Sequence, residues 1–105
     1  MNIDKINIIK RDQVRELCKI ADESGIVKRI VIFGSSVRDD CTEESDVDFW
    51  ISFSCDVQDI RIYNFGTKIG KVLEYNYDML IDGLLILSDA MKHSVFDKGV
   101  TVYER

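Results

Sequence analysis

The stretch "IFGSSVRDDCTEESDVDFWI", from Ile32 to Ile51, joins two apolar segments through a turn and an acidic loop. The carboxylates of this stretch are Asp39, Asp40, Glu43, Glu44, Asp46 and Asp48. Like charges at this density repel one another, so the loop is either a solvated connection or a set of ligands around a cation. The apolar segments on its two sides bear on this choice, because they predict which carboxylates are held in regular structure.

Apolar and β-branched runs predict strands on both sides of the loop and again later in the chain. The run "IVKRIVIF" at 26–33 leads into Gly-Ser, and "DVDFWISF" at 46–53 follows the loop. A third run, "YNYDMLI", occupies 75–81, and "VTVYER" closes the chain at 100–105. These runs predict the strands of a central sheet.

Helical segments alternate with these strands. The first helix has its apolar face at Val14, Leu17, Cys18 and Ala21. Gly25 is placed to end it, a second helix is predicted over 56–73, and Ser88 is placed to cap a third that reaches Lys98. The alternation predicts an α/β or α+β fold for a single domain over residues 1–105, with a mixed central β-sheet and helices packed mainly on one face.

Composition excludes several functional classes. The chain of 105 residues has a net charge of -5, which argues against general binding of nucleic acids, because such binding requires clustered Lys and Arg. Its three cysteines form no CxxC pair, as expected for a reducing compartment. No apolar run approaches the length of a membrane span, and the N-terminus has no apolar signal core. We therefore predict a cytoplasmic protein with no membrane partner.

Two of the carboxylates are predicted to lie within or beside a strand. Side chains alternate along a strand, so Asp46 and Asp48 point to one face while Val47 and Phe49 point to the other. If the run at 75–81 lies beside this strand, Asp78 joins the pair on the same face. Asp82 is a weaker candidate for the third carboxylate: it shares the parity of Asp78 but sits beside Gly83, where the strand should end.

The carboxylate pair predicts a metal site. Two carboxylates about 5 Å apart repel by roughly 3 kcal/mol at an effective dielectric constant near 20. Mg²⁺ removes this conflict and is usually held by one or two carboxylates. The alternative is that Asp46 is a turn residue and Asp48 is merely exposed, but Asp48 precedes Phe49, Trp50 and Ile51, where Asp is depleted. An EF-hand is excluded because the loop lacks the central glycine of a Ca²⁺ site.

The Gly34-Ser35 pair directly follows the first predicted strand. A tight turn at this point exposes backbone N–H groups to a phosphate, because Gly permits a close approach and Ser supplies a hydroxyl. The segment "SSVR" is also suited to opening a short helix, whose N-terminus favours an anion. The pair stands ten residues before Asp46.

These residues together resemble a known family. Gly34-Ser35, ten intervening residues, and then Asp46-Val47-Asp48 are similar to the signature of the polymerase-beta-like nucleotidyltransferase superfamily, and the small size resembles its minimal nucleotidyltransferase branch. The ending "FDKGVTVYER" resembles that branch as well. Many members of the branch are encoded as antitoxins beside a HEPN-type toxin. The resemblance implies the polymerase-beta-like nucleotidyltransferase fold.

The resemblance also implies roles for individual residues. It implies that Gly34 and Ser35 bind the triphosphate of ATP, with Arg38 as a positive group nearby, and that Asp46, Asp48 and Asp78 bind Mg²⁺ and catalyse. AMP would pass to a hydroxyl of a partner protein, with a tyrosine of a HEPN-type toxin as the leading candidate. Acceptor identity, base preference and oligomeric state, a homo-oligomer included, stay open.

One departure from the branch leaves a second function open. The branch continues from Gly-Ser as x-Ala-Arg-Gly, whereas this chain has Ser36-Val37-Arg38-Asp39. Asp39 thus replaces a glycine that normally ends the turn, which bears on the geometry of the loop and on nucleotide affinity. The alternative function is a binding module with weak or no activity that neutralises its partner by occlusion.

Overall fold

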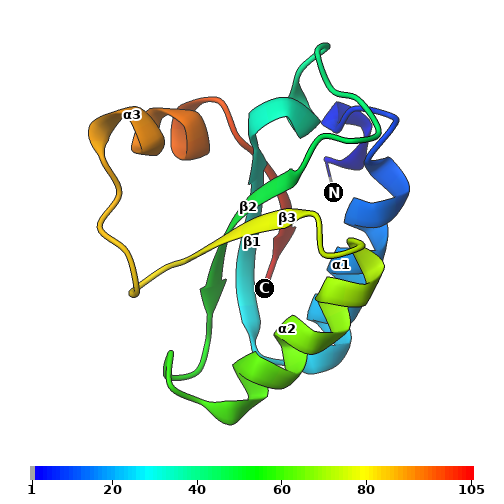
Figure 1. Ribbon diagram of the computed structural model, residues 1–105. Helices are drawn as coiled ribbons and strands as arrows, with labels where there is room; N and C mark the ends of the chain where they lie inside the picture. The colour runs from blue at the N-terminus through cyan, green and yellow to red at the C-terminus, as the bar shows by residue number, and fades with distance from the viewer. Residues whose placement is uncertain (1) are drawn as a thin grey trace.

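The computed structural model describes residues 2–105, which form a four-stranded sheet in the order β3-β2-β1-β4 (Figure 1). The strands are β1 (Val27–Phe33), β2 (Val47–Phe53), β3 (Tyr77–Ile81) and β4 (Val100–Glu104). Strand β1 is antiparallel to both β2 and β4, whereas β3 is parallel to β2. The prediction of a mixed central sheet is therefore confirmed.

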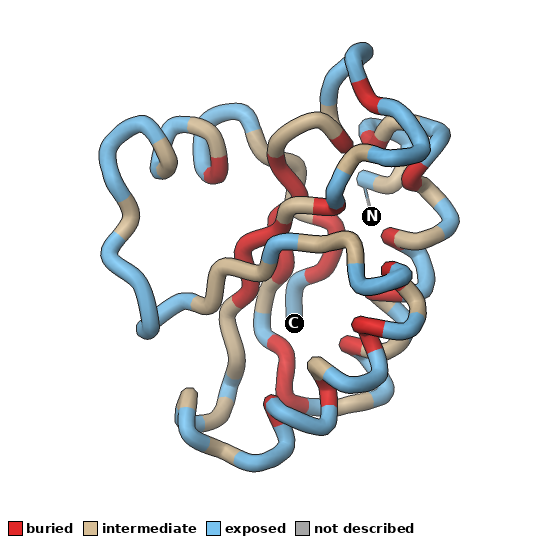
Figure 2. Tube along the Cα trace, in the orientation of Figure 1, coloured by how far each residue is buried: buried red, intermediate tan, exposed pale blue. Residues whose placement is uncertain are grey.

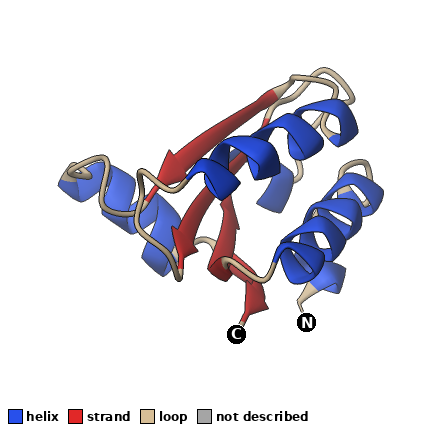
Figure 3. Ribbon diagram, turned by 90° about the horizontal axis from the view of Figure 1, so that it is seen from below, coloured by secondary structure: helices blue, strands red, loops and turns tan. Residues whose placement is uncertain are grey.

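Two long helices cover one face of the sheet (Figure 3). Helix α1 (Arg11–Ser24) ends at Gly25, whose φ of 70° is left-handed as predicted for a helix terminus. Helix α2 (Ile60–Val72) is shorter than the predicted 56–73, because Asp59 caps it by accepting a hydrogen bond from the backbone N–H of Arg61. Helix α2 is also the crossover that two parallel strands require, here β2 and β3.

The main core lies between this helical layer and the sheet (Figure 2). Its largest buried side chains alternate along the strands, as in Ile30 and Ile32 of β1 and Phe49 and Ile51 of β2. Burying such side chains contributes about 1.5–3 kcal/mol each. This burial fixes which way every strand faces, because side chains point alternately to the two sides.

The opposite face is covered only in part, by a short C-terminal helical segment. It consists of α3 (Asp89–Lys92) and the π-helical turn η3 (His93–Asp97). Ser88 caps it as predicted, accepting a hydrogen bond from the Met91 backbone N–H at 3.2 Å. Val95 is fully buried against Val31, Phe33 and Trp50 in a second, smaller cluster. Helices thus lie mainly on one face, with this segment as the exception.

The strand bounds lie within one residue of the predicted ones except at the start of β3. The predicted strand at 75–81 begins only at Tyr77, because Glu74 and Tyr75 adopt left-handed backbone with φ of 55° and 59°. Two short 3₁₀ turns complete the fold, η1 (Ile3–Lys5) and η2 (Gly34–Val37). No helix among residues 2–105 is long and apolar enough to cross a membrane.

Candidate active site

The Gly34-Ser35 turn lies directly against the carboxylate of Asp48. Gly34 follows the last residue of β1 and has a φ of 75°, a left-handed conformation that side chains rarely adopt. A Cβ atom at this position would lie 2.5 Å from Oδ2 of Asp48, well inside van der Waals contact. The sheet explains this proximity, since Phe33 and Asp48 are partners in the antiparallel register of β1 and β2. Glycine is therefore required here for two independent reasons.

The three predicted carboxylates lie at the same end of strands β2 and β3. Asp48 and Asp78 are direct partners in the parallel register, and Asp46 comes immediately before β2. Asp48 shares the face of Trp50, so this set lies on the sparsely covered side of the sheet. Asp82 follows the end of β3 and instead accepts a hydrogen bond from Ser52 at 3.5 Å. The register therefore places Asp78, not Asp82, beside Asp48.

The pKa of Asp48 reflects the electrostatic environment of these carboxylates. Partial burial, followed by the nearby charges of Asp78 and Asp46, raises the pKa of Asp48 to about 6, while Arg38 acts in the opposite direction. Asp46 and Asp78 are themselves exposed. Asp48 is thus a half-buried carboxylate, and its surroundings make the ionised form less stable than it is in water.

The donor set suits a hard cation, although it is not gathered into a closed metal cage. Among residues 2–105, no three His, Cys, Asp or Glu side chains converge closely enough to hold a metal ion as they stand. The donors around Asp48 are all carboxylate oxygens, the ligands that Mg²⁺ prefers. The raised pKa of Asp48 identifies the charge conflict that a cation would relieve. These residues therefore fit Mg²⁺ in donor chemistry.

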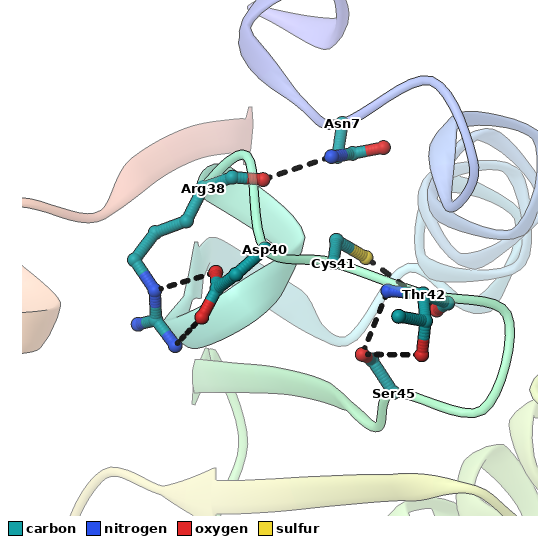
Figure 4. A network of polar contacts seen from close by, with 6 residues as sticks. All are labelled: Asn7, Arg38, Asp40, Cys41, Thr42 and Ser45. Atoms are coloured by element: carbon teal, nitrogen blue, oxygen red, sulfur yellow. Dashed lines mark hydrogen bonds and ion pairs between the residues drawn. The ribbon is translucent and has the colours of Figure 1, made fainter.

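Local hydrogen bonds order the acidic loop between the turn and β2 (Figure 4). The guanidinium of Arg38 pairs with Asp40 at 3.0 Å, and this hydrogen bond lowers the pKa of Asp40. The backbone carbonyl of Arg38 accepts a hydrogen bond from the Asn7 side chain at 2.8 Å. Further along, Ser45 Oγ accepts from the Thr42 backbone N–H at 2.9 Å. The loop therefore has a defined conformation that fixes Arg38 beside the turn.

The substitution at Asp39 does not strain this loop. Asp39 is exposed, and within the described part of the chain only Glu74 and Tyr75 are non-glycine residues with positive φ. The backbone at position 39 therefore does not require a glycine. The buried Lys10 also stabilises the loop, because its Nζ donates a hydrogen bond to the Glu43 carbonyl at 2.9 Å.

A pocket of about 500 Å³ lies over the turn and Asp48. Its lining residues are Phe33, Gly34, Ser35, Val37, Arg38, Asp48, Met91, Ser94 and Lys98. Four of the six predicted site residues line this pocket, while Asp46 and Asp78 lie outside its lining. The volume falls within the range of about 300–1,000 Å³ that is typical of small-ligand sites.

Comparison with known sequences decides the family. The sequence model of the family described as "Polymerase beta, Nucleotidyltransferase" matches residues 15–105, most of the chain. The chain belongs to the polymerase beta nucleotidyltransferase family. A curated relative, named "Putative protein adenylyltransferase MJ0128" and found in Methanocaldococcus jannaschii, is 31% identical over 75 residues, which cover 71% of this chain and 76% of the relative.

Solved structures share the fold of this nucleotidyltransferase. A chain from the complex of the tri-AMPylated Shewanella oneidensis HEPN toxin with an MNT antitoxin matches with a TM-score of 0.62 and 16% identity, covering 91% of this chain and 73% of that chain. A chain from a toxin-antitoxin structure with AMP-PNP matches with a TM-score of 0.61 and 18% identity, covering 90% and 73%. At these identities the likeness establishes the fold, and the predicted polymerase-beta-like fold is confirmed.

Sequence patterns missed one wall of the nucleotidyltransferase pocket. Met91 and Ser94 come from the C-terminal helical segment, Lys98 directly follows it, and all three line the same pocket as the Gly34-Ser35 turn. Their spacing of three and then four residues places them on one side of a helix. That spacing was visible in the sequence, but the place where the segment packs was not.

Proposed function

We propose that this nucleotidyltransferase transfers AMP from ATP to a hydroxyl group of a partner protein. The observation that carries the proposal is a phosphate-type turn that meets one member of a carboxylate pair, Asp48, at a pocket; the other member, Asp78, lies beside Asp48 and outside the pocket lining. Gly34 of the turn contacts Asp48, and Asp48 is in register with Asp78. The adenylyltransferase name of the Methanocaldococcus jannaschii relative supports AMP as the group transferred.

In the proposed complex the triphosphate lies in the pocket over the turn. Gly34 leaves the backbone open for close approach, Ser35 supplies a hydroxyl, and Arg38 supplies a fixed positive charge at the rim. Asp46, Asp48 and Asp78 would hold Mg²⁺, which when bound neutralises phosphate charge and supplies Lewis-acid polarisation. Positioning and charge stabilisation then account for most of the catalysis.

The chemical step is an in-line displacement at the α-phosphorus. The acceptor oxygen forms a bond to the α-phosphorus as the bond to the bridging oxygen of the β-phosphate breaks, and pyrophosphate leaves. The acceptor loses its proton, and Asp78 is the carboxylate placed to receive it. Asp78 is exposed on the edge strand β3, where a protein acceptor has access.

We propose that the acceptor is a tyrosine of a HEPN-type toxin and that the chain acts as its antitoxin. The two structural neighbours support this proposal, one being a complex of a tri-AMPylated HEPN toxin with an MNT antitoxin. An exposed apolar surface beyond the end of β3 also favours a protein partner. Leu84, Leu85 and Ile86 are 55%, 56% and 100% exposed in the connection between β3 and α3. Exposed apolar clusters of this kind often mark protein interfaces.

Calorimetry with ATP and Mg²⁺ tests the nucleotide half of the proposal. Wild-type protein should bind ATP in a Mg²⁺-dependent manner, and the double variant Asp46→Asn with Asp48→Asn should lose that dependence. Absence of Mg²⁺-dependent ATP binding by the wild type would overturn the enzyme proposal. Incubation with the product of a neighbouring HEPN-type gene, followed by mass spectrometry, should then show AMP-sized additions on tyrosine.

A second candidate function is a binding module that neutralises its partner by occlusion. One observation favours it: within residues 2–105 the acidic side chains do not converge into a ready metal cage. Occlusion requires only the apolar surface at Leu84, Leu85 and Ile86. Neutralisation of the partner by the Asp46→Asn, Asp48→Asn variant, without any added AMP, would favour occlusion over transfer.

A further inference from the structure

The C-terminal helical segment is held rigidly against the sheet on the pocket side. Val95 is fully buried in the second cluster, and Phe96 packs edge-on against Trp50 with ring centroids 5.1 Å apart. Gly99 closes the segment: a Cβ there would overlap the Val95 carbonyl and lie 2.6 Å from Cγ1 of Val31. The backbone on both sides of Lys98 is therefore fixed by contacts with β1 and β2.

The π-helical turn determines where Lys98 stands. The backbone N–H of Lys98 donates to the carbonyl of His93 at 3.1 Å, a bond that spans five residues instead of four. His93 also pairs with Asp97 at 2.7 Å, so the carboxylate that precedes Lys98 in the chain already has a partner. As a result Met91, Ser94 and Lys98 all line the pocket opposite the Gly34-Ser35 turn.

Lys98 carries the unpaired positive charge of this pocket. The other cation in the lining, Arg38, is bound to Asp40 through two hydrogen bonds at 3.0 and 3.5 Å. Lys98 forms no ion pair with a carboxylate of residues 2–105 within 4.0 Å. An exposed ammonium with no partner, held at the wall of a concave site, is suited to an anionic ligand.

We infer that Lys98, assisted by the hydroxyl of Ser94, binds the β- and γ-phosphates of the nucleotide from the wall opposite the turn. This inference rests on the proposed function and deepens it. Negative charge accumulates on the departing pyrophosphate as its bond to the α-phosphorus breaks, and Lys98 is placed to stabilise that charge. Lys98 thereby favours a triphosphate over a monophosphate, because AMP has no β- or γ-phosphate for it to contact.

The test compares variants of two lysines, one at the end of α3 and one directly after η3. Lys98→Ala should weaken ATP binding by about tenfold or more, since a charge-assisted phosphate contact is lost. Its affinity for AMP should change less than about threefold, and Lys98→Arg should recover most of the ATP affinity. Lys92→Ala removes the same charge outside the pocket lining, so it should bind ATP as the wild type does. Thermal melting checks that each variant is folded.

Two outcomes would overturn the inference: wild-type ATP affinity in Lys98→Ala, or equal losses for ATP and AMP in a folded variant. Failure of the wild type to bind ATP would instead refute the proposed nucleotidyl transfer. Inorganic pyrophosphate then becomes the probe for Lys98. Binding of pyrophosphate that is lost in Lys98→Ala and kept in Lys92→Ala supports the inference, and absence of any pyrophosphate binding refutes it as well.

Discussion

At the scale of single residues, the contact between Gly34 and Asp48 sets the shape of the site. Gly34 combines a φ of 75° with an α-carbon that faces Oδ2 of Asp48. An added methyl group must therefore both strain the backbone and displace the carboxylate. In the proposed complex, the α-carbon of Gly34 borders both the phosphate and the metal ligand Asp48, so one substitution would disturb both.

Gly34→Ala should lower stability by about 1–2 kcal/mol and weaken ATP binding by at least about tenfold. Urea unfolding and calorimetry measure the two effects. Gly66→Ala is the matched control: a Cβ there meets nothing within 4 Å, and the residue lies inside α2. It should gain up to about 1 kcal/mol of helix propensity and leave ATP binding unchanged. Wild-type ATP affinity in Gly34→Ala would contradict the assigned role of the turn.

The raised pKa of Asp48 makes the free energy of unfolding depend on pH. Folding raises the pKa of the Asp48 carboxyl group from 3.8 to about 6, so below pH 3.8 this group does not destabilise the folded state. The destabilisation grows as pH rises from 3.8 and is complete above pH 6. The undiscounted cost at neutral pH is about 3 kcal/mol, but Asp48 is only half-buried and water screens its charge, so we expect about 1 kcal/mol.

Asp48→Asn should therefore stabilise the metal-free protein by about 1 kcal/mol more at pH 7.5 than at pH 4. Urea unfolding in the presence of a chelator measures the difference. Asp40→Asn is the control with the opposite sign: the Arg38 hydrogen bond lowers the pKa of Asp40, so its contribution is present at neutral pH and fades as pH falls. A pH-independent effect of Asp48→Asn would contradict the charge conflict at the site.

At the scale of elements, the turn between α2 and β3 positions Asp78. Glu74 and Tyr75 both adopt left-handed backbone before the chain enters β3. The side chain of Asn76 then donates to the Glu44 carbonyl at 3.1 Å, which ties this turn to the acidic loop. The strained turn thus fixes the parallel register in which Asp78 stands beside Asp48.

Glu74→Gly should stabilise the protein by about 0.5–1 kcal/mol, because glycine adopts a φ of 55° without the steric cost of a side chain. Thermal or urea unfolding measures the change. The control Glu44→Gly replaces the same residue type in an exposed loop with ordinary φ, and it should lose a few tenths of a kcal/mol to backbone entropy. A loss of stability in Glu74→Gly would show that its side chain, not its backbone, determines the turn.

The elements also show which parts of the site sequence patterns predict. Alternation along a strand sufficed to place Asp46 and Asp48 on one face and to favour Asp78, because the period of two is a local property. The pocket wall formed by Met91, Ser94 and Lys98 depends instead on where a short segment packs. That packing is decided by Val95 entering a cluster with Val31 and Trp50, partners that are distant in the chain. The periodicity of the local sequence does not predict such a long-range contact.

At the scale of the whole molecule, the two faces of the sheet differ: one holds most of the core and the other carries the candidate site. The face under α1 and α2 holds the main core, while the other face carries the carboxylates and only a small second cluster. The predicted fold class followed from the alternation of helices and strands. The side taken by the C-terminal segment did not, because an amphipathic segment of this length can pack on either face.

The two walls of the pocket are far apart in the chain, and this separation affects how the site forms during folding. The turn at Gly34 lies early in the sequence, whereas Lys98 lies beyond β3, next to a segment held by the packing of Val95 against Val31 and Trp50. Closing so long a loop is entropically unfavourable and belongs to the late steps of folding. An incompletely folded chain therefore lacks one wall of the pocket. Under the proposed function, the complete nucleotide site therefore forms only with the finished fold.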